Sequence, residues 1–334
     1  MTGTIAPLPQ GRPILVTGAA GFVAGHVLTA LERTNLARPV VAVCRPRGKP
    51  AGPHDEAANC DIAEDGAVER LIDAYKPAGV IHLAAIAAPR AVNANRDHSW
   101  RVNFEATRRL AEALMQKAKG GRLVFAGSSE AYGESFNTHP LPINEVAPLQ
   151  PRSAYGATKA AADSMLGQLA YDGLDVVRMR PFNHTGPGQS EAYVAPAFAS
   201  QIAAIEAGNA EPVVKVGDLS AHRDFLDVRD VADAYVAALR SDSFQRGAAF
   251  NIASGTSRPM SDLLHTLLSH SVLDIAVERD PDRFHPSPVA EVSGDTQAIS
   301  AALAWQPRIS FEQMLVDVLD DWRGRAGCAT TPSN

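Results

Sequence analysis

Tyr155 and Lys159 are the pair of residues whose types and spacing most directly suggest chemistry. They stand four positions apart in the stretch Ser-Ala-Tyr-Gly-Ala-Thr-Lys, and on a helix this spacing places both side chains on one face. A phenol with an ordinary pKa of about 10 is a poor acid or base at neutral pH. A fixed ammonium beside it favours the phenolate, so we expect Lys159 to lower the pKa of Tyr155. Because such pairs also occur on solvated helix faces, the hypothesis depends on the rest of the chain.

Hydroxyl groups follow the apolar run Arg122–Ala126, in the stretch Gly-Ser-Ser-Glu-Ala-Tyr-Gly. The carboxyl ends of parallel strands face the ligand crevice of a doubly wound sheet. A Ser128 hydroxyl at this position could hydrogen-bond a substrate oxygen while a nearby tyrosine exchanges its proton. For Tyr132 we favour a structural role in the loop.

A glycine-rich segment joins the first apolar run to the first helical pattern. Gly18, Gly21 and Gly25 have the spacing G-x-x-G-x-x-x-G, which differs from G-x-G-x-x-G. Glycines at this turn let a pyrophosphate approach a helix N-terminus closely. They could be plain turn residues, but their place at the first strand–helix turn favours a dinucleotide site. Small residues after His82 would let such a cofactor lie against the backbone, and His82 itself is interpreted as a packed core residue.

The residues after the second apolar run bear on the choice of cofactor. A carboxylate there binds the ribose 2′-hydroxyl of NAD, whereas an arginine accommodates the 2′-phosphate of NADP. The run ends at Cys44 and continues with Arg45, Pro46 and Arg47, without a carboxylate. The sequence therefore favours NADP(H), although both arginines could be solvated surface charges. Asp61 could accept a hydrogen bond from the adenine amino group, or it could be an ordinary turn residue before a helix.

Apolar runs alternate with helical patterns through the first half of the chain, which predicts a parallel sheet covered on both faces. Expected strands are 13–16, 40–44, 79–83, 122–126 and 175–179, and expected helices are 25–33, 67–75, 100–117 and 155–169. After Pro181 this rhythm breaks, and a helix at 195–206 is followed by mixed segments. We therefore predict a Rossmann-type α/β domain over residues 1–180, with the segment at about 225–250 able to pack back onto it. A smaller, irregular α/β substrate domain is predicted over residues 181–327.

Composition narrows the class of protein further. The chain has 334 residues, of which 46% are hydrophobic and 20% charged, and its formal net charge is -6. This profile is typical of a globular protein, and without a basic stripe we expect no nucleic-acid partner. Three scattered cysteines (Cys44, Cys60 and Cys328) form neither a disulfide framework nor a metal-binding spacing. With no signal-like N-terminus and no apolar run long enough for a bilayer, a cytoplasmic protein without a metal is expected.

Taken together, these motifs resemble the extended short-chain dehydrogenase/reductase family of NAD(P)-dependent nucleotide-sugar epimerases, dehydratases and reductases. The resemblance covers nearly the whole chain, through Trp322. The stretches Arg-Pro-Phe-Asn-His-Thr-Gly-Pro-Gly-Gln from Arg180, His-Arg-Asp-Phe-Leu-Asp-Val from His222 and Asn-Ile-Ala-Ser-Gly from Asn251 resemble the branch that contains GDP-4-keto-6-deoxy-D-mannose reductases. Related epimerases carry similar motifs.

The resemblance implies roles for individual residues. Tyr155 would be the acid/base, Ser128 the active-site hydroxyl, and Lys159 would bind the nicotinamide ribose and lower the pKa of Tyr155. Asn183 would contact the sugar nucleotide, Arg223 its phosphates, and Arg283 its diphosphate or ribose. The implied cofactor site consists of Gly18, Gly21, Phe22, Val23, Gly25, Arg45, Asp61, Ile62, Leu83, Ala84, Ala85, Tyr155, Lys159 and Pro181. The implied substrate site consists of Ser128, Asn183, Val194, Arg223 and Arg283.

Glu130 leaves the reaction open. It stands where 4,6-dehydratases of the family carry a glutamate that removes a proton beside the keto group, although it could also orient neighbouring hydroxyls. The reductase-like motif at Asn183 is longer, so we favour reduction of the 4-keto group of a nucleotide-linked 4-keto-6-deoxyhexose. A 4-epimerase or 4,6-dehydratase that recycles its cofactor internally is the first alternative, and a non-catalytic dinucleotide sensor is the second. The resemblance also implies a homodimer formed through helices 100–117 and 155–169.

Overall fold

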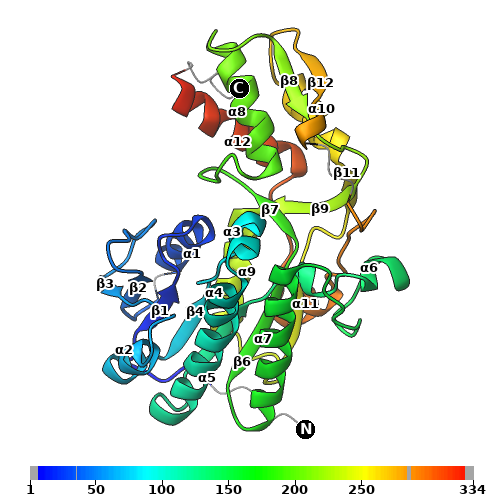
Figure 1. The fold of residues 1–334 in the computed structure, drawn as a ribbon. Coiled ribbons are helices and arrows are strands. Elements are labelled where there is room, and N and C mark those ends of the chain that lie inside the picture. The colour runs from blue at the N-terminus through cyan, green and yellow to red at the C-terminus, as the bar shows by residue number, and fades with distance from the viewer. Residues whose placement is uncertain (1–6, 35, 284–286, 328–334) are drawn as a thin grey trace.

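The computed structural model describes residues 7–34, 36–283 and 287–327. Within these residues, the centre is a parallel sheet of seven strands in the order β10-β6-β5-β4-β1-β2-β3 (Figure 1). The strands are β1 (Ile14–Thr17), β2 (Val40–Cys44), β3 (Glu56–Asn59), β4 (Gly79–His82), β5 (Arg122–Ala126), β6 (Val176–Pro181) and β10 (Ala249–Ile252). The predicted doubly wound α/β fold is confirmed.

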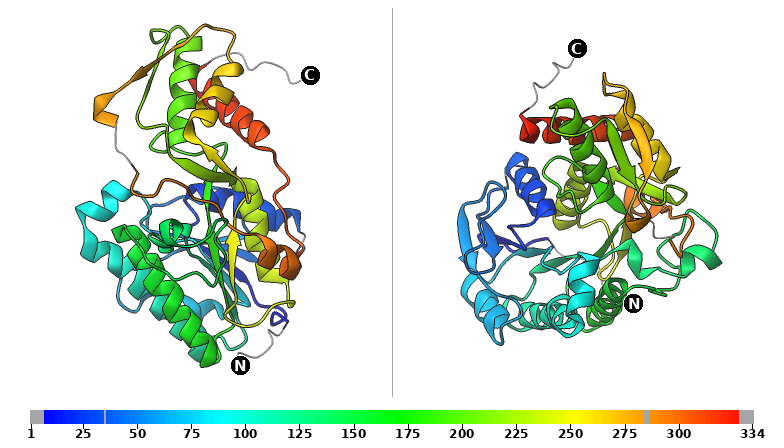
Figure 2. Two further views of the ribbon diagram at one scale, coloured as in Figure 1. Left: turned by 90° about the vertical axis from the view of Figure 1, so that its right-hand side faces the viewer. Right: turned by 45° about the horizontal axis from the view of Figure 1, so that its top comes forward.

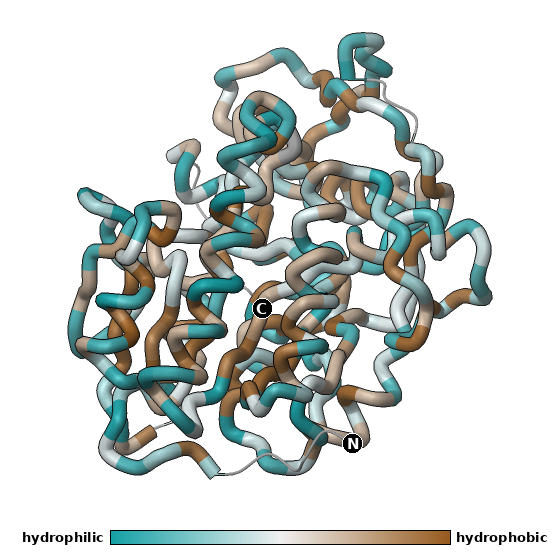
Figure 3. The backbone as a smooth tube through the Cα atoms, turned by 60° about the horizontal axis from the view of Figure 1, so that its bottom comes forward, coloured by the Kyte–Doolittle hydropathy of each residue, from teal (hydrophilic) through white to brown (hydrophobic). Residues whose placement is uncertain are grey.

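Two layers of helices cover the sheet, because successive side chains of a strand point to opposite faces. Ile14 and Val16 of β1 belong to the core on one face, and Leu15 belongs to the core on the other. The first core is closed by α1 (Phe22–Arg33), α9 (Val228–Arg240) and α11 (Gln297–Leu303), and the second by α2 (Ala67–Tyr75), α5 (Ala106–Lys117) and α7 (Ala154–Tyr171). Figure 3 shows the apolar stretches of the backbone gathered in the strands between these layers.

The order of the strands reverses at β1, which lies between β2 and β4. The chain first builds the sheet outward from β1 to β3 and then passes to β4 and β5 on the other side of β1. Ligands of open α/β sheets bind in the crevice at the carboxyl ends of the strands beside such a reversal. The segments that follow β1, β4 and β5 therefore meet at the expected position of a site.

A smaller part of the molecule lies over this edge of the sheet (Figures 1 and 2). It contains α8 (Val194–Glu206), α10 (Met260–Ser269), α12 (Phe311–Ala326), the strands β7 (Asn183–Thr185), β8 (Val213–Val216), β9 (His222–Asp227), β11 (Ser257–Pro259) and β12 (Ala276–Arg279), and the turn η3 (Pro281–Arg283). Its own core includes Phe198, Leu263 and Leu315. The two parts touch where Nε2 of His26, on α1, lies 3.0 Å from the carbonyl oxygen of Pro187.

The chain passes between the two parts more than once. After β9 it returns through α9, which packs on α1, and β10, which joins the edge of the large sheet beside β6. Residues 228–252 therefore lie with the first part, and α11 packs there too. The division of the chain at residue 180 into two domains stays a prediction. None of the helices in the described ranges combines the length and apolar composition that crossing a membrane requires.

Two elements differ from their predicted form. The helix predicted over 100–117 follows α3 (Pro89–Ala94) and consists of α4 (Arg96–Trp100), a π-helical turn over Arg101–Glu105, and α5. The wider turn buries Asn103, whose amide nitrogen donates to the carbonyl oxygen of Ile86 at 3.0 Å, which accounts for the interruption. Strand β3 was not predicted because its residues, Glu-Ala-Ala-Asn, lie at the exposed edge of the sheet and form no apolar run.

Candidate active site

Ser128 and Tyr155 come together at the carboxyl edge of the sheet. Ser128 follows β5 and opens a short 3-10 turn, η2 (Ser129–Ala131), in which its Oγ accepts from the backbone N–H of Glu130 at 3.1 Å. Tyr155 lies in the first turn of α7, and its hydroxyl is hydrogen-bonded to Ser128. The Ser128 side chain is buried. The two hydroxyls predicted to handle the substrate oxygen and the proton are therefore partners in the structure.

Gly156 lets the start of α7 approach the Ser128 loop. A Cβ atom at Gly156 would lie 2.6 Å from the carbonyl oxygen of Glu130, a distance that a larger residue could reach only by moving the helix. Ser153 caps this helix, because its Oγ accepts from the N–H of Gly156 at 2.9 Å. The local sequence therefore sets both where α7 begins and how closely Tyr155 approaches Ser128.

Lys159 follows one turn later and is buried, with 3% of its surface exposed. Its Nζ donates to the carbonyl oxygen of Ala126 at 2.7 Å and lies 5.0 Å from the centre of the Phe125 ring. The same atom lies 5.9 Å from the centre of the Tyr155 ring. Burial lowers the pKa of Lys159 to about 8, because the charged form loses its hydration.

The pKa of Tyr155 is raised rather than lowered. Burial is the main cause and the charge of Glu130 adds to it, while the hydrogen bond with Ser128 opposes them. The physical reason for the upward shift is desolvation of the phenolate, which is its largest cause. The lowering effect expected of Lys159 stays a prediction.

Glu130 is exposed, and its Oε2 accepts from the Ser153 hydroxyl at 2.6 Å. This contact matches the alternative role of Glu130, in which a loop carboxylate orients neighbouring hydroxyls. Glu130 also places a negative charge near Tyr155 and near Arg223. The pKa of Arg223 is lowered, mainly by burial, and the charge of Glu130 partly opposes this lowering. Glu130 is thus part of the site by position.

The glycine-rich turn has the geometry of a dinucleotide cradle. Gly18 has φ +71°, and a Cβ there would lie 2.8 Å from the Cα of Ala84. Gly21 is the N-cap of α1 and offers no side chain to its first-turn N–H groups, which suits a pyrophosphate. Gly25 is explained by packing, because a Cβ added at this position would lie 3.0 Å from the carbonyl oxygen of Ala51.

The other predicted cofactor residues lie along the same edge. Phe22 and Val23 form the first turn of α1, Arg45 is exposed directly after β2, Leu83, Ala84 and Ala85 follow β4, and Pro181 ends β6. Asp61 is half-buried, and its Oδ1 accepts from the N–H of Ala63 at 3.0 Å, while Ile62 is buried. This contact is the turn role that the sequence left open for Asp61.

His82 and Tyr132 have the core positions that were predicted for them. His82 lies 2.7 Å from the Thr17 hydroxyl through Nδ1 and 3.0 Å from the Thr107 hydroxyl through Nε2. Burial lowers its pKa to about 3, and the charge of Lys159 contributes. Tyr132 is fully buried and donates to Oδ1 of Asn251 at 2.7 Å.

The predicted substrate residues come from the smaller part. Asn183 is exposed at the start of β7, and Val194 is the half-buried first residue of α8. Arg223, on β9, donates to Oγ of Ser287 at 2.6 Å. Arg283 is exposed, and its Nε lies 3.2 Å from Oδ2 of Asp280. Both arginines therefore already have partners in the protein.

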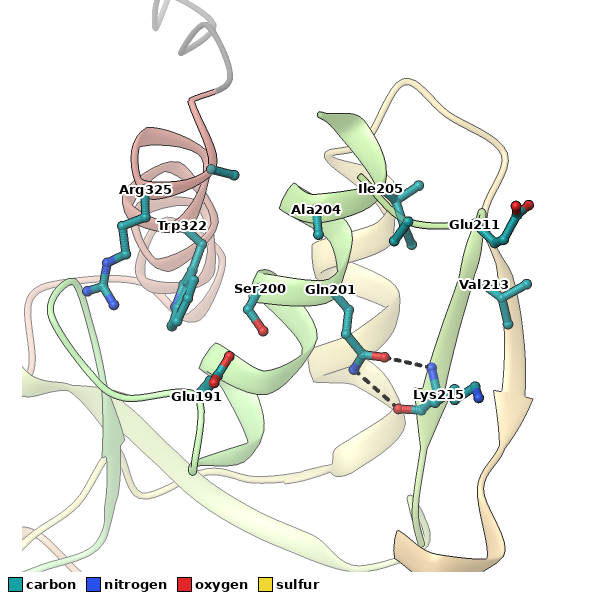
Figure 4. Close-up of a pocket in the computed structure, with 12 residues that line it drawn as sticks. Glu191, Ser200, Gln201, Ala204, Ile205, Glu211, Val213, Lys215, Trp322 and Arg325 are labelled. Atoms are coloured by element: carbon teal, nitrogen blue, oxygen red, sulfur yellow. Dashed lines mark hydrogen bonds between the residues drawn. The ribbon is translucent and has the colours of Figure 1, made fainter. Parts of the chain in front are cut away.

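Sequence reasoning missed Tyr193, which precedes α8 and lies close enough to Tyr155 to raise its pKa. No motif marks it, since only the fold brings this loop over the sheet. A cavity of about 570 Å³ between α8, β8 and α12 contains none of the predicted residues (Figure 4). In the part of the chain that the structure describes, no group of three or more histidine, cysteine, aspartate or glutamate side chains could hold a metal ion, and Cys328 lies outside that part.

Comparisons with known proteins show the family to which the chain belongs. Residues 14–253 match the model of the NAD dependent epimerase/dehydratase family. The chain is 30% identical over 313 residues to a GDP-6-deoxy-D-mannose reductase of Pseudomonas aeruginosa, covering 93% of this chain and 97% of the relative. It is also 30% identical over 326 residues to a UDP-glucose 4-epimerase of Mycolicibacterium smegmatis, covering 93% and 99%. A GDP-mannose 4,6 dehydratase of Arabidopsis thaliana is 27% identical over 269 residues, covering 78% and 72%.

Solved structures give the same result. The structure of RMD from Pseudomonas aeruginosa complexed with NADPH has a TM-score of 0.81 at 29% identity and covers 94% of this chain and 99% of that one. A UDP-glucose 4-epimerase of Thermus thermophilus in complex with NAD has a TM-score of 0.78 at 26% identity, with 94% and 99% covered. This chain belongs to the NAD dependent epimerase/dehydratase family and is an NAD(P)-dependent enzyme, as its motifs predicted.

Proposed function

We propose that this enzyme uses NADPH to reduce the 4-keto group of a nucleotide-linked 4-keto-6-deoxyhexose. The observation that carries the proposal is the hydroxyl pair at the carboxyl edge of the sheet, in which half-buried Tyr155 is hydrogen-bonded to buried Ser128. A reductase needs its tyrosine protonated at neutral pH, because the phenol must give a proton to the developing alkoxide. The GDP-6-deoxy-D-mannose reductase of Pseudomonas aeruginosa supports the substrate class.

The residues of this chain divide the reaction between them. Bound NADPH supplies the hydride that adds to the keto carbon. Ser128 hydrogen-bonds the keto oxygen, and Tyr155 transfers its proton to that oxygen as negative charge develops. Lys159 holds a positive charge 5.9 Å from the centre of the Tyr155 ring, where it stabilises the phenolate left after proton transfer. Its N–H groups would also donate to the cofactor ribose.

The substrate would lie between the two parts of the molecule. Asn183 and Val194 would contact the sugar nucleotide from β7 and the start of α8. Arg223 and Arg283 would stabilise the diphosphate, since guanidinium groups bind phosphate oxygens through two N–H donors at once. Both arginines would have to share donors that now bond to the protein.

The preference for NADPH rests on the end of β2, where Arg45 is exposed and no carboxylate follows the strand. We expect Arg45→Ala to raise KM for NADPH and to leave KM for NADH unchanged, because only NADPH carries the 2′-phosphate. Steady-state kinetics with both cofactors measure this difference. Equal use of NADH and NADPH by the unaltered enzyme would contradict the preference.

A second candidate function is supported by Glu130, which lies beside Tyr155 as the base of a 4,6-dehydratase would. In that reaction, and in 4-epimerisation, the cofactor is reduced and reoxidised within one cycle. Incubation with a panel of nucleotide-linked 4-keto-6-deoxy sugars and NADPH, with NMR of the products, separates the candidates. Net oxidation of NADPH with a 4-hydroxy product is expected, whereas product formation without net oxidation would assign the second function.

We also propose a homodimer formed by α5 and α7, which lie side by side on one face of the molecule in Figure 1. The segment 100–117 and α7 carry Trp100, which is 38% exposed, and Phe104, Met165 and Leu169, which are half-buried against the core on that side of the sheet. Apolar side chains on two adjacent helices suit an isologous contact between identical subunits. A cytoplasmic location stays a prediction.

A further inference from the structure

A buried ionic cluster joins β6 to α7, the helix that carries two of the proposed catalytic residues. Arg180, near the end of β6, donates from Nε to Oδ2 of Asp163 at 2.9 Å and from Nη2 to Oδ1 at 2.8 Å. Asp163 is on α7, and it is 1% exposed while Arg180 is 4% exposed. Arg178 also donates to Oδ1 of Asp163 at 2.7 Å. The two hydrogen bonds between Arg180 and Asp163 form a bidentate contact of fixed geometry between β6 and α7.

The same guanidinium reaches the loop that carries Ser128. Arg180 donates from Nη1 to the Tyr132 hydroxyl at 2.8 Å and to the carbonyl oxygen of Glu145 at 3.0 Å. The Tyr132 hydroxyl then donates to Oδ1 of Asn251, on β10, at 2.7 Å. One buried arginine therefore joins α7, β6, β10 and the segment after β5.

Asp163 is placed where it controls the orientation of α7. It lies four residues after Lys159 and eight after Tyr155, so all three side chains share one face of the helix. A rotation or a slide of α7 that moved Tyr155 away from Ser128 would break the bidentate contact. Tyr132 belongs to the same loop as Ser128 and Glu130, so the cluster holds both halves of the hydroxyl pair.

We propose that Arg180, Asp163 and Tyr132 form a positioning cluster that sets Tyr155 and Lys159 against Ser128. The inference rests on the proposed role of Tyr155 as proton donor. Stability alone does not explain the cluster, because apolar residues of similar volume often replace a buried ion pair without loss of stability. Misplacement of a reacting group by about 1 Å, in contrast, can lower a rate by about 100-fold.

The chain contains a matched control at the other end of β6. Arg122, the first residue of β5, is fully buried, and its Nε lies 3.2 Å from Oδ1 of Asp175, which directly precedes β6. This pair is likewise a buried arginine and an aspartate that tie β6 to a neighbouring element, here β5, but it lies at the amino edge of the sheet. Asp163→Asn and Asp175→Asn each remove one buried charge, and only the first touches the proposed cluster.

The experiment compares these two variants by Tm, kcat, KM and the solvent deuterium isotope effect on kcat. Both are expected to lower Tm. Asp163→Asn is expected to lower kcat by roughly 10- to 100-fold with KM for NADPH little changed, and to raise the isotope effect as proton transfer from Tyr155 becomes slower. Asp175→Asn is expected to keep the kcat and isotope effect of the unaltered enzyme. Equal losses of kcat in the two variants, or an unchanged kcat in Asp163→Asn, would overturn the proposal.

Tyr132→Phe gives a second test that does not break the ion pair. It removes only the hydroxyl that joins Arg180 to Asn251, so the protein is expected to fold while kcat falls and the isotope effect rises. If Asp163→Asn does not fold, unchanged values in Tyr132→Phe overturn the proposal. If the unaltered enzyme reduces no 4-keto sugar, the proposed function fails, and the same comparison is made on the epimerisation or dehydration that it catalyses, in which Tyr155 also transfers a proton.

Discussion

Burial raises the pKa of Tyr155, and the charge of nearby Glu130 adds to this effect. The neutral phenol is the form that can donate to an alkoxide, whereas oxidation of a sugar hydroxyl needs the phenolate as base. Lys159 has a pKa of about 8, so its charge is present through the neutral range and is lost as the pH rises above that value.

Replacement of Tyr155 by phenylalanine tests the proton donor. We expect Tyr155→Phe to lower turnover by about 10²- to 10⁴-fold, the usual contribution of a positioned acid or base. Binding of NADPH, measured by cofactor fluorescence, should change little, because the ring remains. Tyr171→Phe is the matched control on the same helix, since Tyr171 is 72% exposed. Near-normal turnover of Tyr155→Phe would refute the role.

Glu130→Gln tests the charge beside the phenol. A negative neighbour favours the neutral phenol, so its removal should lower the pKa of Tyr155. Spectrophotometric titration of the phenols, with Tyr155→Phe subtracted to isolate this residue, measures the shift. Glu134→Gln, in the same loop, should leave the pKa of Tyr155 unchanged. If Glu130→Gln instead abolishes all turnover, then Glu130 acts as the base of a dehydratase.

At the scale of elements, α7 connects the stability of the fold to the chemistry. Its N-cap, Ser153, accepts from the N–H of Gly156 and donates to Glu130. Its first two turns carry Tyr155 and Lys159, and its third turn carries Asp163. Helix α7 therefore carries, in this order, the N-cap serine, the proposed proton donor, the ammonium and the buried aspartate.

Removal of the N-cap of α7, compared with removal of the N-cap of α12 as a control, separates the effect on stability from the effect on catalysis. Ser153→Ala and Ser310→Ala each remove an N-cap, since Oγ of Ser310 accepts from the N–H of Gln313 at 3.1 Å at the start of α12. Each should lower the free energy of unfolding by about 0.5–2 kcal/mol, as measured by denaturant titration. Only Ser153→Ala should also lower kcat, because it frees the helix end beside Glu130. An unchanged kcat in Ser153→Ala would show that the cap has no part in placing Tyr155.

At the scale of the whole molecule, the site lies where two parts of the chain meet. In the proposed site, the large sheet would supply the hydroxyls and the cofactor cradle, and the smaller part would supply Asn183, Arg223 and Arg283. The loop at Pro187 and Gly188 contacts the first turn of α1, where Gly188 lies against Phe22. A substrate bound between the parts would therefore contact both.

The proposed dimer is tested on the same scale. Trp100→Glu places a charge on the apolar face of α4, α5 and α7, so we expect it to convert a dimer into a monomer, as measured by light scattering after size exclusion. Val272→Glu is the control, because Val272 is 97% exposed on the smaller part. A monomeric unaltered enzyme, or a dimer that Trp100→Glu does not weaken, would contradict the proposed interface.

The sequence determined the architecture because apolar runs and helical periodicity are local signals. Strands such as β2 and β5 agree with their predicted ranges for this reason, and the exposed strand β3 was missed because it carries no such signal. Gly18, Ser128, Tyr155 and Lys159 could be found because the family's motifs have fixed spacings. Tyr193 and the Arg180–Asp163 pair could not, since their partners lie far away in the chain.

By itself, therefore, the sequence determined the family, the doubly wound sheet and the identity of the hydroxyl, phenol and ammonium at its edge. Only the tertiary structure decided the direction in which the pKa of Tyr155 is shifted. Spacing along a helix predicts that Tyr155 and Lys159 share a face, but the pKa depends on burial and on charges brought from other segments. Desolvation acts through every atom that surrounds a group, and that environment exists only once the chain has folded.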